Sequence, residues 1–351
     1  MNIETNVPLQ PYNTFGISAK ALQLVRIRQV SDLDELLAQP ALRDLPKFIL
    51  GEGSNIVLTA DVKQLVLKVE LMGKRLVVED SKSWLIEASA GENWHEFVEW
   101  TLANGYTGLE NMAMIPGCVG ACPVQNIGAY GVELQDRFDS LDAIDLQTGQ
   151  AMTLEAAQCG FGYRDSVFKH APGASSKNLG LAGRALITRV RFRLSKQWRP
   201  EISYTDLQKK VDETKINNPD AKQIFDWVCA IRRNKLPDPS RVGNAGSFFK
   251  NPTVTPVQCA DIIAREPKLV HYVMVDGSHK LAAAWLIESC GWRGKSVGNA
   301  AVYDKQALVL INKGGIKEPC TGGEVMTLAK AIQTSVYERF GILLEPEPVV
   351  V

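Results

Sequence analysis

The chain has 351 residues, of which 45% are hydrophobic and 22% charged, a composition typical of a globular protein with two or three domains. Lysine plus arginine and aspartate plus glutamate are equal at 39 each, so no overall field attracts nucleic acid or an anionic membrane. No signal peptide is evident, no apolar run approaches the roughly 20 residues of a membrane span, and the seven cysteines are scattered, so we expect a cytoplasmic protein with reduced thiols.

Short strands and turns alternate in the first third of the chain. Four strands are expected there, at 47–50, 56–58, 65–69 and 84–88. A helix is expected at 94–104, because Asn93 is a good N-cap, Gly105 is a good stop, and apolar residues recur on one face.

Residues 107–131 have neither a helical nor a strand period and contain five glycines. A compact domain rarely keeps so long an irregular run without a use for it. Farther on, Val190, Phe192 and Leu194 alternate with arginines, which predicts a strand at 189–194 with a solvated basic face. A helix at 221–234 is expected to bury Ile224, Trp227, Val228 and Ile231 and to end at 235–239.

The last hundred residues are richer in helices. Helices are expected from Thr255-Pro256, at 281–290 and at 325–340, where Gly341 ends the helix, and strands at 308–311 and 342–344. The coarse fold class is α+β, with a sheet-rich N-terminal part followed by a smaller α/β domain.

Three familiar motifs are not supported. The segment Gly294-Lys295-Ser296 is not a P-loop, because Ser289 stands where the first glycine is needed. Cys118 and Cys122 have no second ligand pair and are better explained as small buried thiols than as zinc ligands. No metal site is expected, and no G-x-G-x-x-G opens a Rossmann unit.

Four other stretches carry chemical interest, each with a structural alternative. The turn 51–55 (GEGSN) follows a strand and is either a phosphate cradle or a hairpin turn. The run 116–131 combines small residues with amide donors and is either a ligand-binding loop or an Ω-loop. Arg164 suits a planar carboxylate or pairs with Asp165. The C-terminal glutamates 345 and 347, held between prolines, project from a stiff segment or belong to an acidic tail.

Ser247 in GNAGSFFKNP is not the nucleophile of a G-x-S-x-G elbow, because Phe249 replaces the second glycine. Together with Asn13-Thr14-Phe15-Gly16, GEGSN, IPGCVGACPVQNIGAYG, FGYRDS, KLPDP, DGSHKLAAAWLIE, QALVLIN and LEPE, in this order, it resembles the UDP-N-acetylenolpyruvoylglucosamine reductase family over residues 11 to 347.

This resemblance implies a fold of three parts. Two form a FAD-binding domain of the vanillyl-alcohol-oxidase (VAO/PCMH) type, at 1–72 with 342–351 returning to it, and at 73–235. The third, at 236–341, is a smaller α/β substrate-binding domain. Non-covalent FAD, NADPH as hydride donor, a nucleotide-sugar substrate and a monomeric state are implied, with neither nucleic acid nor membrane as a partner.

The resemblance also implies roles for individual residues. The catalytic positions are Arg164, Ser247 and Glu347. The FAD contacts are Gly51, Glu52, Gly53, Ser54, Asn55, Ile115, Pro116, Gly117, Gly120, Gln125, Asn126, Gly128, Ala129 and Tyr130. The substrate contacts are Tyr204, Lys235, Asn251 and Gln306, and Tyr204 matches a tyrosine that one branch of the family folds over the substrate.

The implied reaction reduces an enolpyruvyl ether to the muramate product. Arg164 and protonated Glu347 would stabilise developing negative charge, and Ser247 would act as a general acid rather than a nucleophile, with Lys250 or Asn251 beside its alkoxide. The sequence departs from the family pattern at two places: Ala121-Cys122 replaces a frequent serine pair, and Pro348-Val349-Val350-Val351 follows Glu347 in place of the longer strand that many members carry. Another flavoenzyme of the same fold and a non-catalytic nucleotide-sugar-binding protein are the alternatives.

Overall fold

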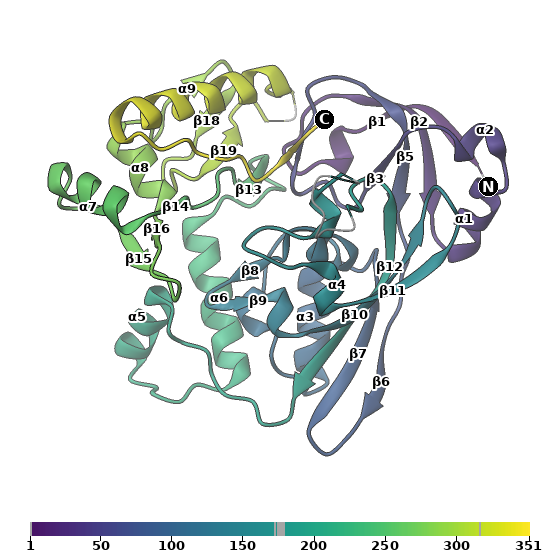
Figure 1. Ribbon diagram of the computed structural model, residues 1–351, viewed down its shortest axis with the longest axis horizontal. Helices are drawn as coiled ribbons and strands as arrows, with labels where there is room; N and C mark the ends of the chain where they lie inside the picture. The colour runs from purple at the N-terminus through teal and green to yellow at the C-terminus, as the bar shows by residue number, and fades with distance from the viewer. Residues whose placement is uncertain (1, 172, 174–179, 316) are drawn as a thin grey trace. The chain divides into compact units, whose positions relative to one another are not determined.

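The computed structural model describes residues 2–171, 173, 180–315 and 317–351, and the chain divides into two compact units. The N-terminal unit comprises Met1–Val7, Ala21–Glu52 and Lys63–Asn234, and the C-terminal unit comprises Pro8–Lys20, Gly53–Val62 and Lys235–Val351. Both contain helices and sheets (Figure 1). The three-part division at 72, 235 and 341 is a different partition and stays a prediction.

Two sheets form the framework of the N-terminal unit. The first has the order β1-β2-β5-β3, with β1 (Ile3–Pro8), β2 (Lys20–Ile27), β5 (Val62–Val69) and β3 (Lys47–Leu50). The second is antiparallel, in the order β11-β10-β12-β7-β6, with β11 (Ala151–Glu155), β10 (Phe138–Asp145), β12 (Ala185–Ser195), β7 (Ser83–Ser89) and β6 (Lys74–Glu79).

Helices and short turns complete this unit. The helices are α1 (Val30–Leu37), α2 (Pro40–Arg43), α3 (Trp94–Ala103), α4 (Ala156–Cys159), α5 (Thr205–Thr214) and α6 (Ala221–Lys235). The region predicted to be irregular consists of the 3-10 helices η2 (Glu110–Met112) and η3 (Val119–Gln125) and the hairpin of β8 (Gly128–Ala129) and β9 (Val132–Glu133). Two more 3-10 helices follow, η4 (Leu134–Asp136) and η5 (Val167–Lys169).

The five-stranded sheet has two chemically different faces. On one face α3 packs Trp94 and Phe97 against Phe192, with ring centroids 5.8 and 5.2 Å apart. The other face carries the arginines of β12, of which Arg193 is exposed and Arg189 and Arg191 are partly exposed. Arg191 bonds the carboxylates of Glu87 and Asp142, and Glu87 is only 6% exposed. Carboxylates on the two adjacent strands thus neutralise Arg191.

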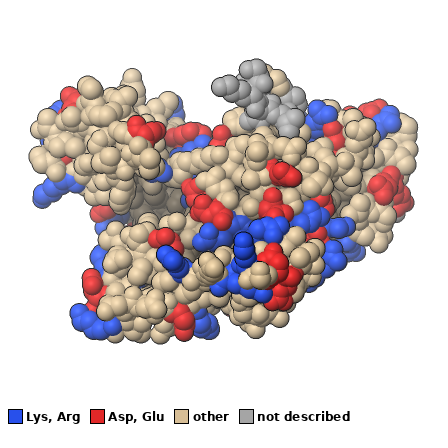
Figure 2. All heavy atoms as spheres, turned by 60° about the horizontal axis from the view of Figure 1, so that its bottom comes forward, with Lys and Arg blue, Asp and Glu red and all other residues tan. Residues whose placement is uncertain are grey.

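The surface shows the same mixing of charge. On the face shown in Figure 2, acidic and basic side chains lie beside one another rather than gathering by sign. This agrees with the equal totals of the two kinds in the sequence. Among the described residues, no helix is both long enough and apolar enough to cross a membrane.

The C-terminal unit has a four-stranded sheet in the order β13-β19-β18-β17, with β13 (Asn244–Ser247), β19 (Val309–Asn312), β18 (Ala300–Val302) and β17 (Ser296–Val297). A three-stranded sheet follows the order β14-β16-β15, with β14 (Thr253–Val254), β16 (His279–Leu281) and β15 (His271–Val273). Strand β20 (Val349–Val350) pairs parallel to β4 (Ile56–Val57). The helices are η1 (Gln10–Tyr12), α7 (Pro256–Arg265), α8 (Ala283–Ser289) and α9 (Gly322–Phe340).

Segments far apart in the sequence meet in this unit. The hydroxyl of Thr14 donates to the carbonyl of Asn244 at 2.7 Å, and its amide donates to the carbonyl of Gly53 at 3.1 Å. Helix α9 lies beside the four-stranded sheet (Figure 1) and ends at Gly341, as predicted, where φ is 70°.

Some predicted elements need correction. Helix α8 begins at Ala283 rather than at residue 281, because Leu281 ends strand β16. Residues 342–344 are not a strand. On α6 the buried aromatic is Phe225, whereas Trp227 is only half-buried.

Candidate active site

The turn 51–55 crosses from one unit to the other, so its residues are described in two groups. In the N-terminal unit, a Cβ on Gly51 would lie 2.6 Å from the sulfur of Cys118, and Glu52 accepts a hydrogen bond from Asn93 at 2.9 Å. In the C-terminal unit, Gly53 has φ of 62°, and a Cβ there would lie 2.1 Å from the carbonyl oxygen of Tyr12. Gly53 is therefore required by close backbone packing, and Gly51 by its closeness to the buried sulfur of Cys118.

The side chain of Asn55 ties this turn to the last residues of the chain. The side-chain amide of Asn55 donates to the carbonyl of Glu347 at 3.3 Å, and the backbone carbonyl of Asn55 accepts from the amide of Val349 at 3.0 Å. Together with the pairing of β20 and β4, these bonds hold the segment around Glu347. The short segment after Glu347 is therefore held by main-chain pairing.

The loop that contains Ile115, Pro116, Gly117 and Gly120 lies against the entry to α3. The carbonyl of Gly117 accepts from the amide of Trp94 at 3.0 Å, and the amide of Gly120 donates to Ala90 at 2.9 Å. A Cβ on Gly120 would stand 2.5 Å from the Cβ of Ala90. Only glycine lets these two segments approach so closely.

The end of this loop is set by Asn126, which is 0% exposed and has left-handed backbone with φ of 44°. Its amide donates to Glu133 and to the carbonyl of Gly162, both at 3.0 Å, and its side-chain oxygen accepts from Gln135. Both the nitrogen and the oxygen of this side chain therefore have hydrogen-bond partners within the protein. Any contact of Asn126 with a cofactor would therefore be made by its backbone, while its side chain positions the hairpin that carries Gly128, Ala129 and Tyr130.

Arg164 lies beside that hairpin in the N-terminal unit. Its guanidinium donates to the carbonyl of Gly128 at 3.0 Å and stands 5.3 Å from the ring centre of Tyr163. The alternative of an ion pair with Asp165 is not what the structure shows, because Asp165 contacts His170 at 2.8 Å. Arg164 has φ of 55°, a left-handed conformation that is costly for a residue other than glycine.

Sequence reasoning missed a second arginine in this unit, Arg232 on α6. Its Nε is buried without a hydrogen-bond partner among the described residues. Burial lowers the pKa of Arg232, and nearby Arg164 lowers it further, whereas Tyr130 raises it. Burial in turn raises the pKa of Tyr130 to about 12, against the effect of Arg232. The helical period of α6 could have identified Arg232, which follows the buried Ile231 and lies three residues before Lys235.

Tyr204 stands directly before α5 and is 46% exposed. Its ring meets that of Tyr130 edge to face, with centroids 5.2 Å apart. Two arginines and two tyrosines thus gather in the N-terminal unit, a set suited to an anionic, planar ligand.

The other two catalytic candidates lie in the C-terminal unit, on neighbouring segments. The amide of Glu347 donates to the carbonyl of Phe248 at 2.9 Å, and Phe249 forms a bridge with Pro346. This pairing sets Ser247 at the end of β13 next to the Glu347 segment. Glu347 is 7% exposed, whereas Ser247 is half-buried and follows Gly246, whose φ is 71° with no atom within 4 Å of a Cβ.

The remaining candidates are also placed within the C-terminal unit. Lys250 forms an ion pair with Glu345, which neutralises its charge. Asn251 accepts from the amide of Ala283 at 3.0 Å and caps α8. Gln306 is half-buried in the turn before β19, and Lys235 is exposed at the end of α6.

The residues of the two loops fit FAD in their chemistry. Gly51 and Gly120 have no side chain at positions where the loops pack closely. Gly117 and Tyr130 have positive φ, a conformation that does not continue regular strand pairing. Arg164 and Arg232 supply positive charge in the same unit. A long anionic cofactor with a flat ring system needs these features.

Two family models match the chain. Residues 21–155 match the FAD binding domain, and residues 238–351 match the UDP-N-acetylenolpyruvoylglucosamine reductase, C-terminal domain. Together they confirm the predicted fold class, in which a FAD-binding part precedes a smaller C-terminal domain.

Curated relatives align over almost the whole chain. A UDP-N-acetylenolpyruvoylglucosamine reductase of Azoarcus sp. (strain BH72) is 52% identical and covers 99% of this chain and 98% of its own. The protein of that name from Paraburkholderia xenovorans (strain LB400) is 51% identical over 97% and 96%. The crystal structure of the MurB reductase from Thermus caldophilus covers 100% and 99%, with a TM-score of 0.66 at 22% identity, and supports the fold.

Proposed function

The chain belongs to the UDP-N-acetylenolpyruvoylglucosamine reductase family, and from that premise we propose how its own residues carry the reaction. It is a UDP-N-acetylmuramate dehydrogenase, a flavoenzyme of peptidoglycan precursor synthesis that uses FAD and NADPH. It reduces the enolpyruvyl ether of a nucleotide sugar. The roles of single residues, the capping tyrosine and a monomeric state are parts of the proposal.

The observation that carries the proposal is the pairing of the Ser247 and Glu347 segments in the C-terminal unit. When bound, FAD supplies the hydride that it has received from NADPH. Hydride addition to the double bond leaves negative charge on the carbon beside the substrate carboxylate. A group that can give a proton to that carbon is then required.

We assign the proton transfer to Ser247. Its hydroxyl donates to the carbon while Glu347, in its protonated form, gives a second hydrogen bond to the developing charge. The open space around Gly246 leaves room for a ligand beside the hydroxyl. Because Lys250 is paired with Glu345, Asn251 and backbone amides are the better partners for the serine alkoxide.

Arg164 holds the substrate carboxylate. Its guanidinium has a fixed donor geometry, and the bond to Gly128 orients it. Arg232, which interacts with Tyr130 and lies near Arg164, adds positive charge. In this proposal Tyr204, Lys235, Asn251 and Gln306 contact the nucleotide sugar, with Tyr204 acting as a cap over it.

The binding of FAD is assigned to the backbone and short side chains of the two loops. These are 51–55 and the residues Ile115, Pro116, Gly117, Gly120, Gln125, Asn126, Gly128, Ala129 and Tyr130. Two observations support this assignment. Gly51 and Gly120 lack side chains where the loops pack closely, and residues 21–155 match a FAD binding domain.

The experiment is an anaerobic absorbance titration of the purified protein. We expect a yellow protein whose flavin absorbance is lost with one equivalent of NADPH and restored with one equivalent of the UDP-sugar enol ether. A colourless protein, or flavin that only oxygen reoxidises, would contradict the assignment. Light scattering after size exclusion tests the expected monomer.

A further inference from the structure

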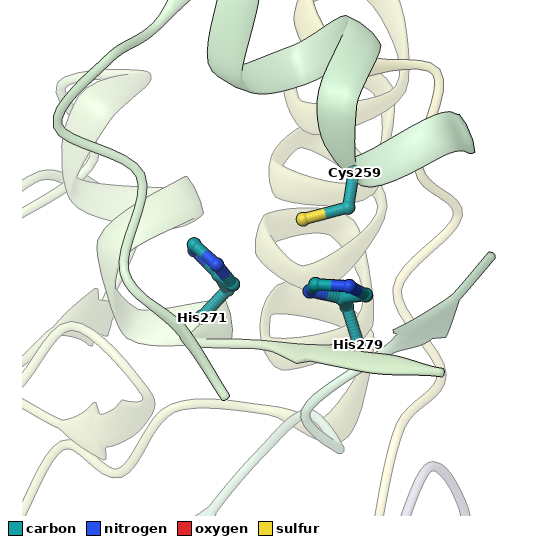
Figure 3. Close-up of side chains that lie close together, drawn as sticks. All are labelled: Cys259, His271 and His279. Carbon is teal, nitrogen blue, oxygen red and sulfur yellow. The ribbon is translucent and has the colours of Figure 1, made fainter. Parts of the chain in front are cut away.

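Three potential metal ligands converge in the C-terminal unit, apart from the residues assigned to the reaction. Cys259 comes from α7, His271 from the start of β15, and His279 from the start of β16. One ligand atom of each lies within 4.8 Å of the other two. Figure 3 shows the sulfur of Cys259 pointing down from the helix toward the two imidazole rings.

Local structure fixes all three positions. In the antiparallel pair β15–β16, His271 is opposite Leu281 and His279 is opposite Val273, so the two histidines lie diagonally on one face. Their ring centroids are 5.2 Å apart. Helix α7 starts from a capping box of Thr255 and Gln258, which places Cys259 in its first turns with 0% exposure.

The hydrogen bonding of these rings is incomplete. Nδ1 of His279 is buried and has no partner within the described part of the chain. Leaving such an atom unsatisfied destabilises the folded protein. Nδ1 of His271 lies 3.4 Å from the carbonyl oxygen of Leu269, a contact that favours a proton on Nδ1 and leaves Nε2 as the ligand atom.

We propose that Cys259, His271 and His279 bind one transition-metal ion of the Zn²⁺ class, with water in the fourth position. Thiolate and imidazole are the ligands that this class of ion prefers. Donor atoms around tetrahedral zinc stand roughly 3.5 Å apart, so the side chains need to close by about 1 Å. The ion would join α7 to the β15–β16 hairpin.

This site differs from the expectation of no metal ligands. Cys118 and Cys122 are close in the sequence, whereas these three ligands come from separate elements. Burial raises the pKa of the Cys259 thiol, so the metal must displace its proton. Binding would therefore release a proton to the solvent.

The first experiment titrates untagged, full-length protein with Zn²⁺ and with Co²⁺. We expect one ion per chain by elemental analysis, a cobalt–thiolate charge-transfer band, and a Tm that rises with the zinc concentration. No bound ion, or a cobalt spectrum without a thiolate band, would overturn the proposal.

The second experiment compares variants with matched controls. Cys259→Ser, His271→Ala and His279→Ala should each weaken metal binding by roughly 100-fold or more, since each removes a direct ligand. Cys290→Ser, a half-buried thiol of the same unit, and His170→Ala should bind as the unaltered protein does. If Cys259→Ser or His279→Ala fails to fold, the half-buried His271 still decides, and unchanged binding in His271→Ala would overturn the proposal.

Discussion

In the N-terminal unit, Arg164 and Tyr130 stand on left-handed backbone with φ of 55° and 49°, whereas in the C-terminal unit Ser247 and Glu347 lie on segments paired by main-chain hydrogen bonds. The left-handed position before Ser247 is taken by Gly246, for which it is not costly. Arg164 and Tyr130 therefore sit on strained backbone, whereas Ser247 and Glu347 sit on relaxed backbone.

The difference indicates how each set is held. The backbone strain at Arg164 and Tyr130 is of the order of 1–2 kcal/mol per residue and must be offset by interactions with neighbouring residues. Hydrogen bonds supply that restraint: Asn111 donates to the carbonyl of Tyr130 at 2.8 Å, and Arg164 donates to that of Gly128. In the other unit main-chain pairing and the side-chain amide of Asn55 set the positions, so substitution of Ser247 or Glu347 should leave the fold intact.

The largest expected effect is that of Ser247→Ala. Loss of a general acid should lower kcat by roughly 10³-fold while NADPH still reduces the flavin at its normal rate. Stopped-flow absorbance separates the two half-reactions. Ser240→Ala, in an exposed turn of the same unit, is the control and should be fully active. Normal turnover by Ser247→Ala would show that another group delivers the proton.

Next in size is the substitution of Arg164. Arg164→Met and Arg164→Gly should both lose roughly 100-fold in kcat/KM, because the charge that binds the carboxylate is gone. The glycine variant should resist urea better than the methionine variant by about 1 kcal/mol, because φ of 55° does not strain glycine. Equal stability of the two variants would mean that the backbone there is not strained.

A pair of glycine substitutions compares close packing with strain. Gly53→Ala should destabilise the protein by about 3 kcal/mol or more, since the new Cβ meets the backbone of Tyr12 as well as an unfavourable φ. Gly246→Ala has a similar φ but open space, and should cost about 1 kcal/mol. Urea midpoints measure both, and the reverse order would contradict the packing described.

The smallest effect concerns Tyr130. Its pKa is raised to about 12, chiefly by burial, so the folded state favours the protonated phenol. The stability that this provides is complete below the ordinary tyrosine pKa of about 10 and is lost as the pH rises toward 12. Alkaline absorbance titration of Tyr130→Phe should lack the last tyrosinate step. A missing step near pH 10 would instead mean that Tyr130 titrates as an ordinary tyrosine.

Sequence was most informative where a local signal acts by itself. Asn93 caps α3, Thr255 begins α7 and Gly341 ends α9 as predicted, since caps depend on a few adjacent residues. The start of α9 was placed three residues late, because the capping box of Thr321 and Glu324 was overlooked.

Predictions that depend on distant partners did worse. The arginines of β12 could not be recognised as paired, because Glu87 and Asp142 lie on neighbouring strands far away in the sequence. Arg232 could not be recognised as a candidate site residue, because its burial and its interaction with Tyr130 appear only in the folded chain. The family resemblance supplied the catalytic positions, whereas the cluster of Cys259, His271 and His279 needed three elements to be folded first.

The bonds from Thr14 to Asn244 and from Asn55 to Glu347 also bear on the order in which the protein forms. They join residues 230 and 292 positions apart, so the C-terminal unit cannot close until the ribosome has released nearly the whole chain. Most of the N-terminal unit, Lys63–Asn234, is continuous and can fold earlier. A nascent chain would thus be able to form the loop at 107–131 and to place Arg164 well before Ser247 and Glu347 reach their positions.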